Sequence, residues 1–197
     1  MSEKARHQGG GFPVIKPVFL ISLPRSGSTL LQKLLMTQRG VDSRAETWMI
    51  LASLAPFSEN VESYSNYSVS TMRSAHESFF VRTSARKKHL KALGVAMLDT
   101  LSQGKSGSVL LEKTPRNYLV LDEIAEAFPD GRFIVLLRDP VDILSSVMHT
   151  WSRGGFFRVP GYQVDFELGS KSISKFVNGE HQNRCIVCNY ENLVDNV

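Results

Sequence analysis

Short apolar runs alternate with amphipathic stretches along most of this chain of 197 residues. Four of the runs have the length and the β-branched or aromatic content of buried strands, and turn residues follow them. The segments between the runs repeat their apolar residues every three or four positions, which predicts helices. The predicted strands lie at about 18–23, 109–112, 132–137 and 185–190, and the predicted helices at 28–38, 47–54, 72–103, 117–128 and 140–151.

Strands that alternate with helices favour an α/β fold, in which helices cover both faces of a parallel sheet. Such sheets bind their ligands at the carboxyl ends of the strands. We therefore expect the residues that follow the predicted strands to gather at one edge. The length suits a single domain over residues 17–197, after a flexible lead-in over 1–16. The residues expected at the edge are Pro24–Thr29, Lys113, Arg138 and Tyr190.

The turn after the first predicted strand has the composition of an anion site. Its sequence, LPRSGSTLL over residues 23–31, carries a strand through a Gly/Ser turn into a helix. The first N–H groups of a helix have no partner within it, and the helix dipole favours an anion there. Arg25 adds a planar donor fork, and Ser26, Ser28 and Thr29 add hydroxyl groups.

The charge of the chain is mildly positive, with a net charge of +4 and a pI near 9.1. This fits a small anionic ligand. The basic residues are scattered, and their only cluster, Arg86–Lys88 with Lys91, indicates a solvated helix face rather than a nucleic-acid site. The five histidines show no metal-ligand spacing, so no metal site is predicted.

The two cysteines, Cys185 and Cys188, stand three apart on a predicted strand and should point to opposite faces. We interpret them as buried thiols, because no second ligand pair for zinc stands nearby. So few cysteines indicate a reducing compartment. Residues 1–11 hold no apolar signal core and no run reaches the length of a membrane span, so we expect a cytoplasmic protein.

A phosphate-binding loop of the nucleoside triphosphatases would place Lys after its last glycine. Here Ser28 follows Gly27, and no predicted strand ends in a tandem acidic pair that could hold magnesium. This weakens a P-loop NTPase or small-molecule kinase, which remains an alternative. A second alternative is a non-catalytic nucleotide-binding fragment.

Three segments, in their order along the chain, resemble those of sulfotransferases that use 3′-phosphoadenosine 5′-phosphosulfate (PAPS). The first is the anion loop, and the second is a strand, an arginine and a helix with serine. The third is a Tyr-Glu-x-Leu stretch after the last strand, and a Glu-Lys-Thr-Pro segment lies between the first two. The anion loop is residues 23–31, the strand, arginine and helix are residues 133–140 with Ser145 and Ser146, and the Tyr-Glu-x-Leu stretch is residues 190–193. The Glu-Lys-Thr-Pro segment is residues 112–115.

The resemblance implies a P-loop-type α/β/α fold around a central, mostly parallel sheet. It implies in-line transfer of a sulfuryl group to a hydroxyl or amine of a small molecule, sugar or peptide, without a metal. The products would be the sulfated acceptor and 3′,5′-adenosine bisphosphate. The resemblance assigns donor binding to Arg25, Ser26, Gly27, Ser28, Thr29, Arg138, Ser146 and Tyr190.

For catalysis, cations are needed at the leaving phosphate and a base at the acceptor. Arg25 and Lys113 are the candidate cations. The branch that resembles tyrosylprotein sulfotransferases and related bacterial sulfotransferases implies Glu46 as the base. Glu46 could instead cap the helix predicted from Thr47, and Lys113 could be an ordinary exposed lysine at a strand end.

Other candidates have structural alternatives as well. Arg138 could pair with Asp139, Ser145 competes with Ser146, and Tyr190 could serve packing alone. Core packing is favoured over an acceptor pocket for Trp48, Trp151, Phe156 and Phe157.

The chain ends just after the Tyr-Glu-x-Leu stretch, whereas members of the family continue with further helix and a basic, Gly-rich segment. We therefore expect either a fragment or a short member whose site is partly open.

Overall fold

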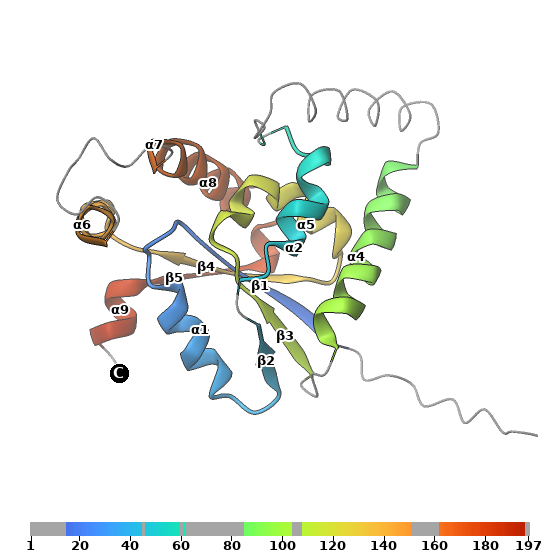
Figure 1. The fold of residues 1–197 in the computed structure, drawn as a ribbon, viewed down its shortest axis with the longest axis horizontal. Helices are drawn as coiled ribbons and strands as arrows, with labels where there is room; N and C mark the ends of the chain where they lie inside the picture. The colour runs from blue at the N-terminus through green and yellow to red at the C-terminus, as the bar shows by residue number, and fades with distance from the viewer. Residues whose placement is uncertain are drawn as a thin grey trace, which may run out of the picture.

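The computed structural model describes residues 15–44, 46–59, 61, 85–103, 108–150 and 162–195. Within these residues one parallel sheet has the strand order β2-β3-β1-β4-β5 (Figure 1). The prediction of an α/β fold with a parallel sheet is therefore confirmed. The strands are β1 (Lys16–Ser22), β2 (Val41–Ser43), β3 (Val109–Glu112), β4 (Arg132–Leu137) and β5 (Cys185–Asn189).

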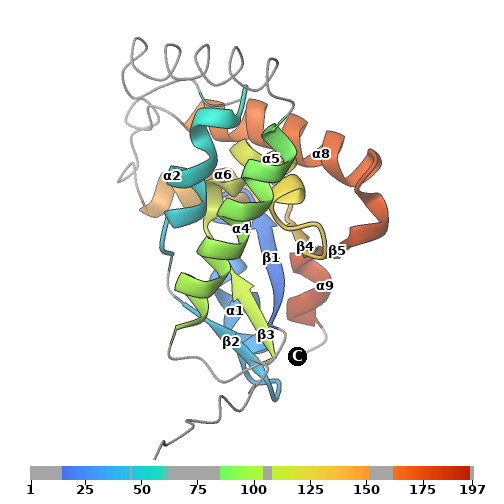
Figure 2. The same ribbon diagram turned by 90° about the vertical axis from the view of Figure 1, so that its right-hand side faces the viewer.

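Neighbouring residues of a strand point to opposite sides of the sheet, so both faces carry apolar side chains. Helices cover both of these faces. Phe19 and Ile21 of β1 belong to the larger apolar core, whereas Leu20 between them belongs to the smaller one. The larger core contains residues of α2 (Met49–Leu54), α4 (Arg86–Ser102), α5 (Leu121–Ala127) and α8 (Ser170–Asn178). The smaller core includes residues of α1 (Ser28–Met36) and α9 (Tyr190–Asp195). Figure 2 shows the sheet and these helices from the side.

A third apolar cluster joins α6 (Pro140–Thr150) to the segment that precedes α8. It consists of Ile143, Val147 and Tyr162, with Leu23 and Phe166 packed against them. This cluster holds α6 beside the turn that follows β1.

The predicted bounds of β3 and β4 coincide with the observed ones, whereas other regions differ. The helix predicted over 117–128 begins as a 3₁₀ helix, η2 (Pro115–Val120), and becomes α-helical only in α5. Residues 162–168 fall in a stretch without a predicted helix, but they form α7 (Tyr162–Val164) and most of the π-helical turn η4 (Asp165–Gly169). The remaining short helices are η1 (Ala55–Phe57) and η5 (Gln182–Arg184).

The helix predicted from Thr47 begins at Met49, because Trp48 adopts a left-handed backbone conformation. The predicted helix over 72–103 is described only from Arg86, and Trp151, Phe156, Phe157 and most of the lead-in lie outside the described residues.

Cys185 packs against the larger core and Cys188 against the smaller one, so the two thiols do lie on opposite faces. Both are unpaired and only partly buried, which corrects the prediction of buried thiols. In the part of the chain that the structure describes, no three His, Cys, Asp or Glu residues are grouped as a metal site. None of the described helices is long and apolar enough to cross a bilayer.

Candidate active site

The turn between β1 and α1 has the backbone of an anion cradle. Arg25 and Gly27 both have positive φ, 68° and 89°, which turns successive N–H groups toward one side. Among the described residues, no side chain caps α1 and no acidic residue stands in its first turn. The first N–H groups of α1 therefore depend on water or a ligand. A side chain at Gly27 would also overlap the ring of Tyr190.

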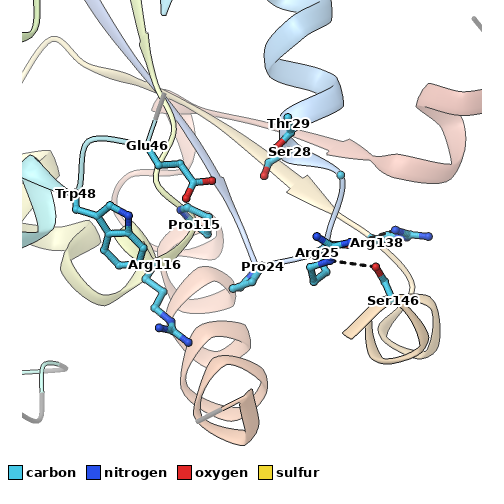
Figure 3. A pocket seen from close by; sticks show the side chains of 11 residues that line it. Pro24, Arg25, Ser28, Thr29, Glu46, Trp48, Pro115, Arg116, Arg138 and Ser146 are labelled. Atoms are coloured by element: carbon cyan, nitrogen blue, oxygen red, sulfur yellow. Dashed lines mark hydrogen bonds between the residues drawn. The ribbon is translucent and has the colours of Figure 1, made fainter. Parts of the chain in front are cut away.

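A pocket of about 430 Å³ opens at this turn (Figure 3). It lies at the carboxyl ends of the strands, where the sequence predicts a ligand site. Its walls come from the β1–α1 turn, the segment before α2, the start of η2, the end of β4 and α6. The lining residues are Pro24, Arg25, Gly27, Ser28, Thr29, Glu46, Trp48, Pro115, Arg116, Arg138 and Ser146.

Lys113 and Glu46 form an ion pair between the cradle and the rest of the pocket. The Nζ atom of Lys113 lies 2.5 Å from Oε1 of Glu46 and donates to Oγ1 of Thr29 at 3.3 Å. Lys113 is only 4% exposed, so it is not an ordinary surface lysine. Glu46 does not cap α2 either, because the N-cap position belongs to Trp48.

Arg138 lies beside the cradle and is held from several sides. Its Nη1 donates to the carbonyl oxygen of Arg25 at 3.2 Å, and its guanidinium lies 4.3 Å from the centre of the Tyr190 ring. It pairs with Asp142 at 3.8 Å rather than with Asp139. Its Nε is buried and has no hydrogen-bond partner among the described residues.

Asp139 caps α6, as its position before Pro140 predicts, by accepting from the N–H of Val141 at 2.7 Å. The N–H of Asp139 donates to Glu191 Oε1 at 2.9 Å. This hydrogen bond lowers the pKa of Glu191 and ties the start of α9 to the loop after β4. The ring of Tyr190 is thereby held against Gly27.

The serine that faces Arg25 is Ser146. Arg25 donates from Nε to Ser146 Oγ and from Nη2 to Thr150 Oγ1, both at 3.1 Å. Ser145 is exposed and does not line the pocket. Ser26 is 1% exposed and is buried beneath the turn rather than lining the pocket.

A buried polar network that the sequence analysis missed lies under the Lys113 segment. Glu112 accepts from Thr114 Oγ1 at 2.7 Å and from Asn117 Nδ2 at 2.6 Å. Burial raises the pKa of Glu112 to about 7, although both hydrogen bonds and the charge of Lys113 act in the other direction. The network fixes the chain as it turns from β3 into η2.

A second unpredicted group lies on the other side of the pocket. Asp165, 1% exposed, receives two hydrogen bonds of 2.9 Å from Nε and Nη2 of Arg116. It also accepts from the hydroxyl of Tyr118, and burial raises the pKa of that phenol well above its usual range. Tyr162 donates to the carbonyl oxygen of Pro24 at 3.1 Å, which braces the turn from the same side.

Comparisons with known proteins agree with this architecture. Residues 17–197 match a family model described as the sulfotransferase family. Nodulation protein NoeE of Sinorhizobium fredii is 32% identical over 133 residues, which make up 68% of this chain and 31% of NoeE. The chain therefore matches about a third of the length of that relative.

Two solved structures share the fold. A sulfotransferase from Alicyclobacillus acidocaldarius has a TM-score of 0.58 and 12% identity, over 92% of this chain and 75% of that one. The sulfotransferase domain of the Synechococcus PCC 7002 olefin synthase has a TM-score of 0.51 and 20% identity, over 95% of this chain and 71% of that one.

Proposed function

Because the chain belongs to the sulfotransferase family, we propose that it transfers a sulfuryl group from PAPS to a hydroxyl or amine, with Glu46 as the general base. One observation carries this proposal. One pocket is lined by the start of α1, which no described side chain caps, and by Glu46, which is paired with the buried Lys113. Arg25 and Arg138 lie on one side of Glu46, and Trp48 and Arg116 lie on the other.

The residues present fit an anionic nucleotide donor. Among the described residues no side chain caps the start of α1, so its first N–H groups are available to an anion, and the ring of Tyr190 packs against Gly27 beside them. Arg138 has a buried Nε without a partner in the described part of the chain. In the proposal the turn holds the 5′-phosphosulfate, and Arg138 and Ser146 hold the 3′-phosphate. Tyr190, whose ring lies against Gly27 and Arg138, supports both of these sets of binding residues.

During transfer, a bond forms between the acceptor atom and sulfur while the bond from sulfur to the phosphate oxygen breaks, which leaves negative charge on the phosphate. Glu46 takes the proton of the acceptor at Oε1 or Oε2. The ammonium group of Lys113 reaches both Glu46 and Thr29, so it is placed to stabilise the developing charge. Arg25 adds a second cation on the same side.

The proposal is tested by incubating the chain with PAPS, EDTA and a mixture of hydroxyl and amine acceptors, and searching for sulfated products by mass spectrometry. We expect sulfated product from the wild type. Glu46→Gln should lower turnover by about 10²- to 10⁴-fold, as expected for loss of a general base. Glu59→Gln is the matched control, because Glu59 is exposed and lies outside the pocket.

Two outcomes would contradict the proposal. Equal turnover by the wild type and Glu46→Gln would remove Glu46 from the mechanism. Phosphorylated products that form only with ATP and magnesium would favour a kinase.

A further inference from the structure

The pocket has two ends, and the proposed donor accounts for only one of them. Figure 3 shows Arg25, Arg138 and Ser146 on one side of Glu46, and Trp48 and Arg116 on the other. A base must lie next to the hydroxyl that it deprotonates. If Glu46 is that base, the acceptor has to lie at the end that Trp48 and Arg116 line.

Trp48 presents an aromatic surface at this end. It is 38% exposed, although indole is one of the side chains that gain most from burial. Its backbone has φ 57° and ψ 2°, a left-handed conformation that is disfavoured for a residue with a side chain. The N–H of Ala52 donates to the Trp48 carbonyl oxygen at 2.9 Å, so Trp48 stands directly at the start of α2. Strain that keeps a large aromatic group exposed in a pocket indicates a ligand for it.

Arg116 supplies fixed hydrogen-bond donors at the same end. Its two bonds of 2.9 Å to Asp165 orient the plane of the guanidinium. Asp165 is itself fixed, because it is buried and also bonded to Tyr118. An arginine held in this way loses little conformational freedom when it binds a ligand oxygen.

Among the described residues, the cations at this end are paired within the protein. Arg116 is neutralised by Asp165, and Lys113 by Glu46. An acidic peptide or an acidic glycan would require cations that are not already paired with carboxylates. The arrangement therefore favours an uncharged acceptor.

We infer that the acceptor is a neutral saccharide. The C–H face of a sugar ring suits the electron-rich face of Trp48. Its several hydroxyl groups let one lie at Glu46 while others accept from Arg116. A simple phenol has only one hydroxyl and would leave Arg116 without a ligand oxygen. This inference rests on the proposed function, since it takes Glu46 as the base.

Saturation-transfer NMR on the 197-residue chain, saturated with 3′,5′-adenosine bisphosphate, tests the inference. The probes are methyl β-glucopyranoside and lactose, a methyl glucuronide, and an acidic peptide that contains tyrosine. We expect transfer to the ring C–H protons of the neutral sugars. Trp48→Ala should weaken their binding about tenfold, whereas Trp48→Phe should retain most of it.

Arg116→Lys tests the second contact and should also weaken the sugar. It is preferred to alanine, which would leave the buried Asp165 without its cation and could unfold the chain. The affinity for the bisphosphate should stay unchanged in all three variants.

The outcomes distinguish a failure of the saccharide inference from a failure of the proposed sulfotransferase function. Binding of the bisphosphate together with the peptide or the glucuronide, but with neither neutral sugar, overturns the saccharide inference and leaves the sulfotransferase proposal in place. Sugar binding that is equal in the wild type and Trp48→Ala overturns it as well. A chain that binds no bisphosphate contradicts the proposed function, and the inference falls with it.

Discussion

Glu112, the last residue of β3, should make the stability of the protein depend on pH. It is 7% exposed and accepts two hydrogen bonds, from Thr114 and Asn117. Burial raises its pKa from 4.5 to about 7, so the folded state holds this proton more tightly than the unfolded state does. The stability that the neutral form provides is present in full below pH 4.5 and is lost as the pH rises through about 7.

The size of the effect follows from the rise in pKa. At about 1.4 kcal/mol per pH unit, a rise from 4.5 to about 7 corresponds to about 3 kcal/mol. Glu112→Gln removes the titration and keeps the shape. Oδ1 of Asn117 is buried without a hydrogen-bond partner among the described residues, so rotation of that amide would let it accept from the new amide group.

The assay is urea unfolding of the wild type and Glu112→Gln at pH 5 and pH 8. We expect the difference in unfolding free energy between the two proteins to change by about 2 to 3 kcal/mol over this interval, in favour of the variant at pH 8. Glu123, whose pKa is also raised to about 7 by burial, contributes equally to both proteins and cancels. Exposed Glu59→Gln is the control and should parallel the wild type. Parallel curves for Glu112→Gln would refute the reasoning.

Two further substitutions test the donor end and the packing of the helices. Arg138→Ala should weaken 3′,5′-adenosine bisphosphate by about 10- to 100-fold in a calorimetric titration, because hydrogen bonds to charged groups contribute about 1.5–3 kcal/mol. Arg132→Ala, at the opposite end of β4, should leave the affinity unchanged, and equal losses would argue against a specific phosphate contact. Gly94→Ala should destabilise the fold by about 1–3 kcal/mol, because its Cβ would overlap the carbonyl oxygen of Ala127. The thermal midpoint measures this, with exposed Val95→Ala as control, and an unchanged midpoint for Gly94→Ala would show that α4 does not pack so tightly on α5.

The sheet and the edge that carries the site could be predicted because both depend on local patterns. The apolar run of β4 is bounded by polar residues, so its ends are visible in the sequence. Parallel strands then bring their carboxyl ends to one edge, whatever the detail of the helices. This is why Lys113, Arg138 and Tyr190, which are far apart along the chain, are found beside the turn over 24–29.

The contacts that shape the acceptor end could not be predicted in the same way. Arg116 and Asp165 are 49 residues apart, and neither belongs to a pattern that indicates its partner. Left-handed backbone at Trp48 is set by its surroundings, since tryptophan has no local preference for it. The 3₁₀ geometry of η2 could not be predicted from the sequence either, because the apolar spacing of residues 117–128 fits a regular α-helix.

The partners of Glu46 and Lys113 define both residues more sharply than their sequence positions do. Glu46 could have been a helix cap and Lys113 a surface lysine by their sequence positions alone. The ion pair between them, with Lys113 buried, excludes both alternatives. The catalytic role of the pair stays a prediction.

The claim that this pocket is the donor site of a sulfotransferase is tested most directly by calorimetric titration with 3′,5′-adenosine bisphosphate in the presence of EDTA. We predict saturable binding at one site, weakened by Arg25→Ala and Arg138→Ala and unchanged by Glu46→Gln. Absence of bisphosphate binding, together with ATP binding that requires magnesium, would contradict it.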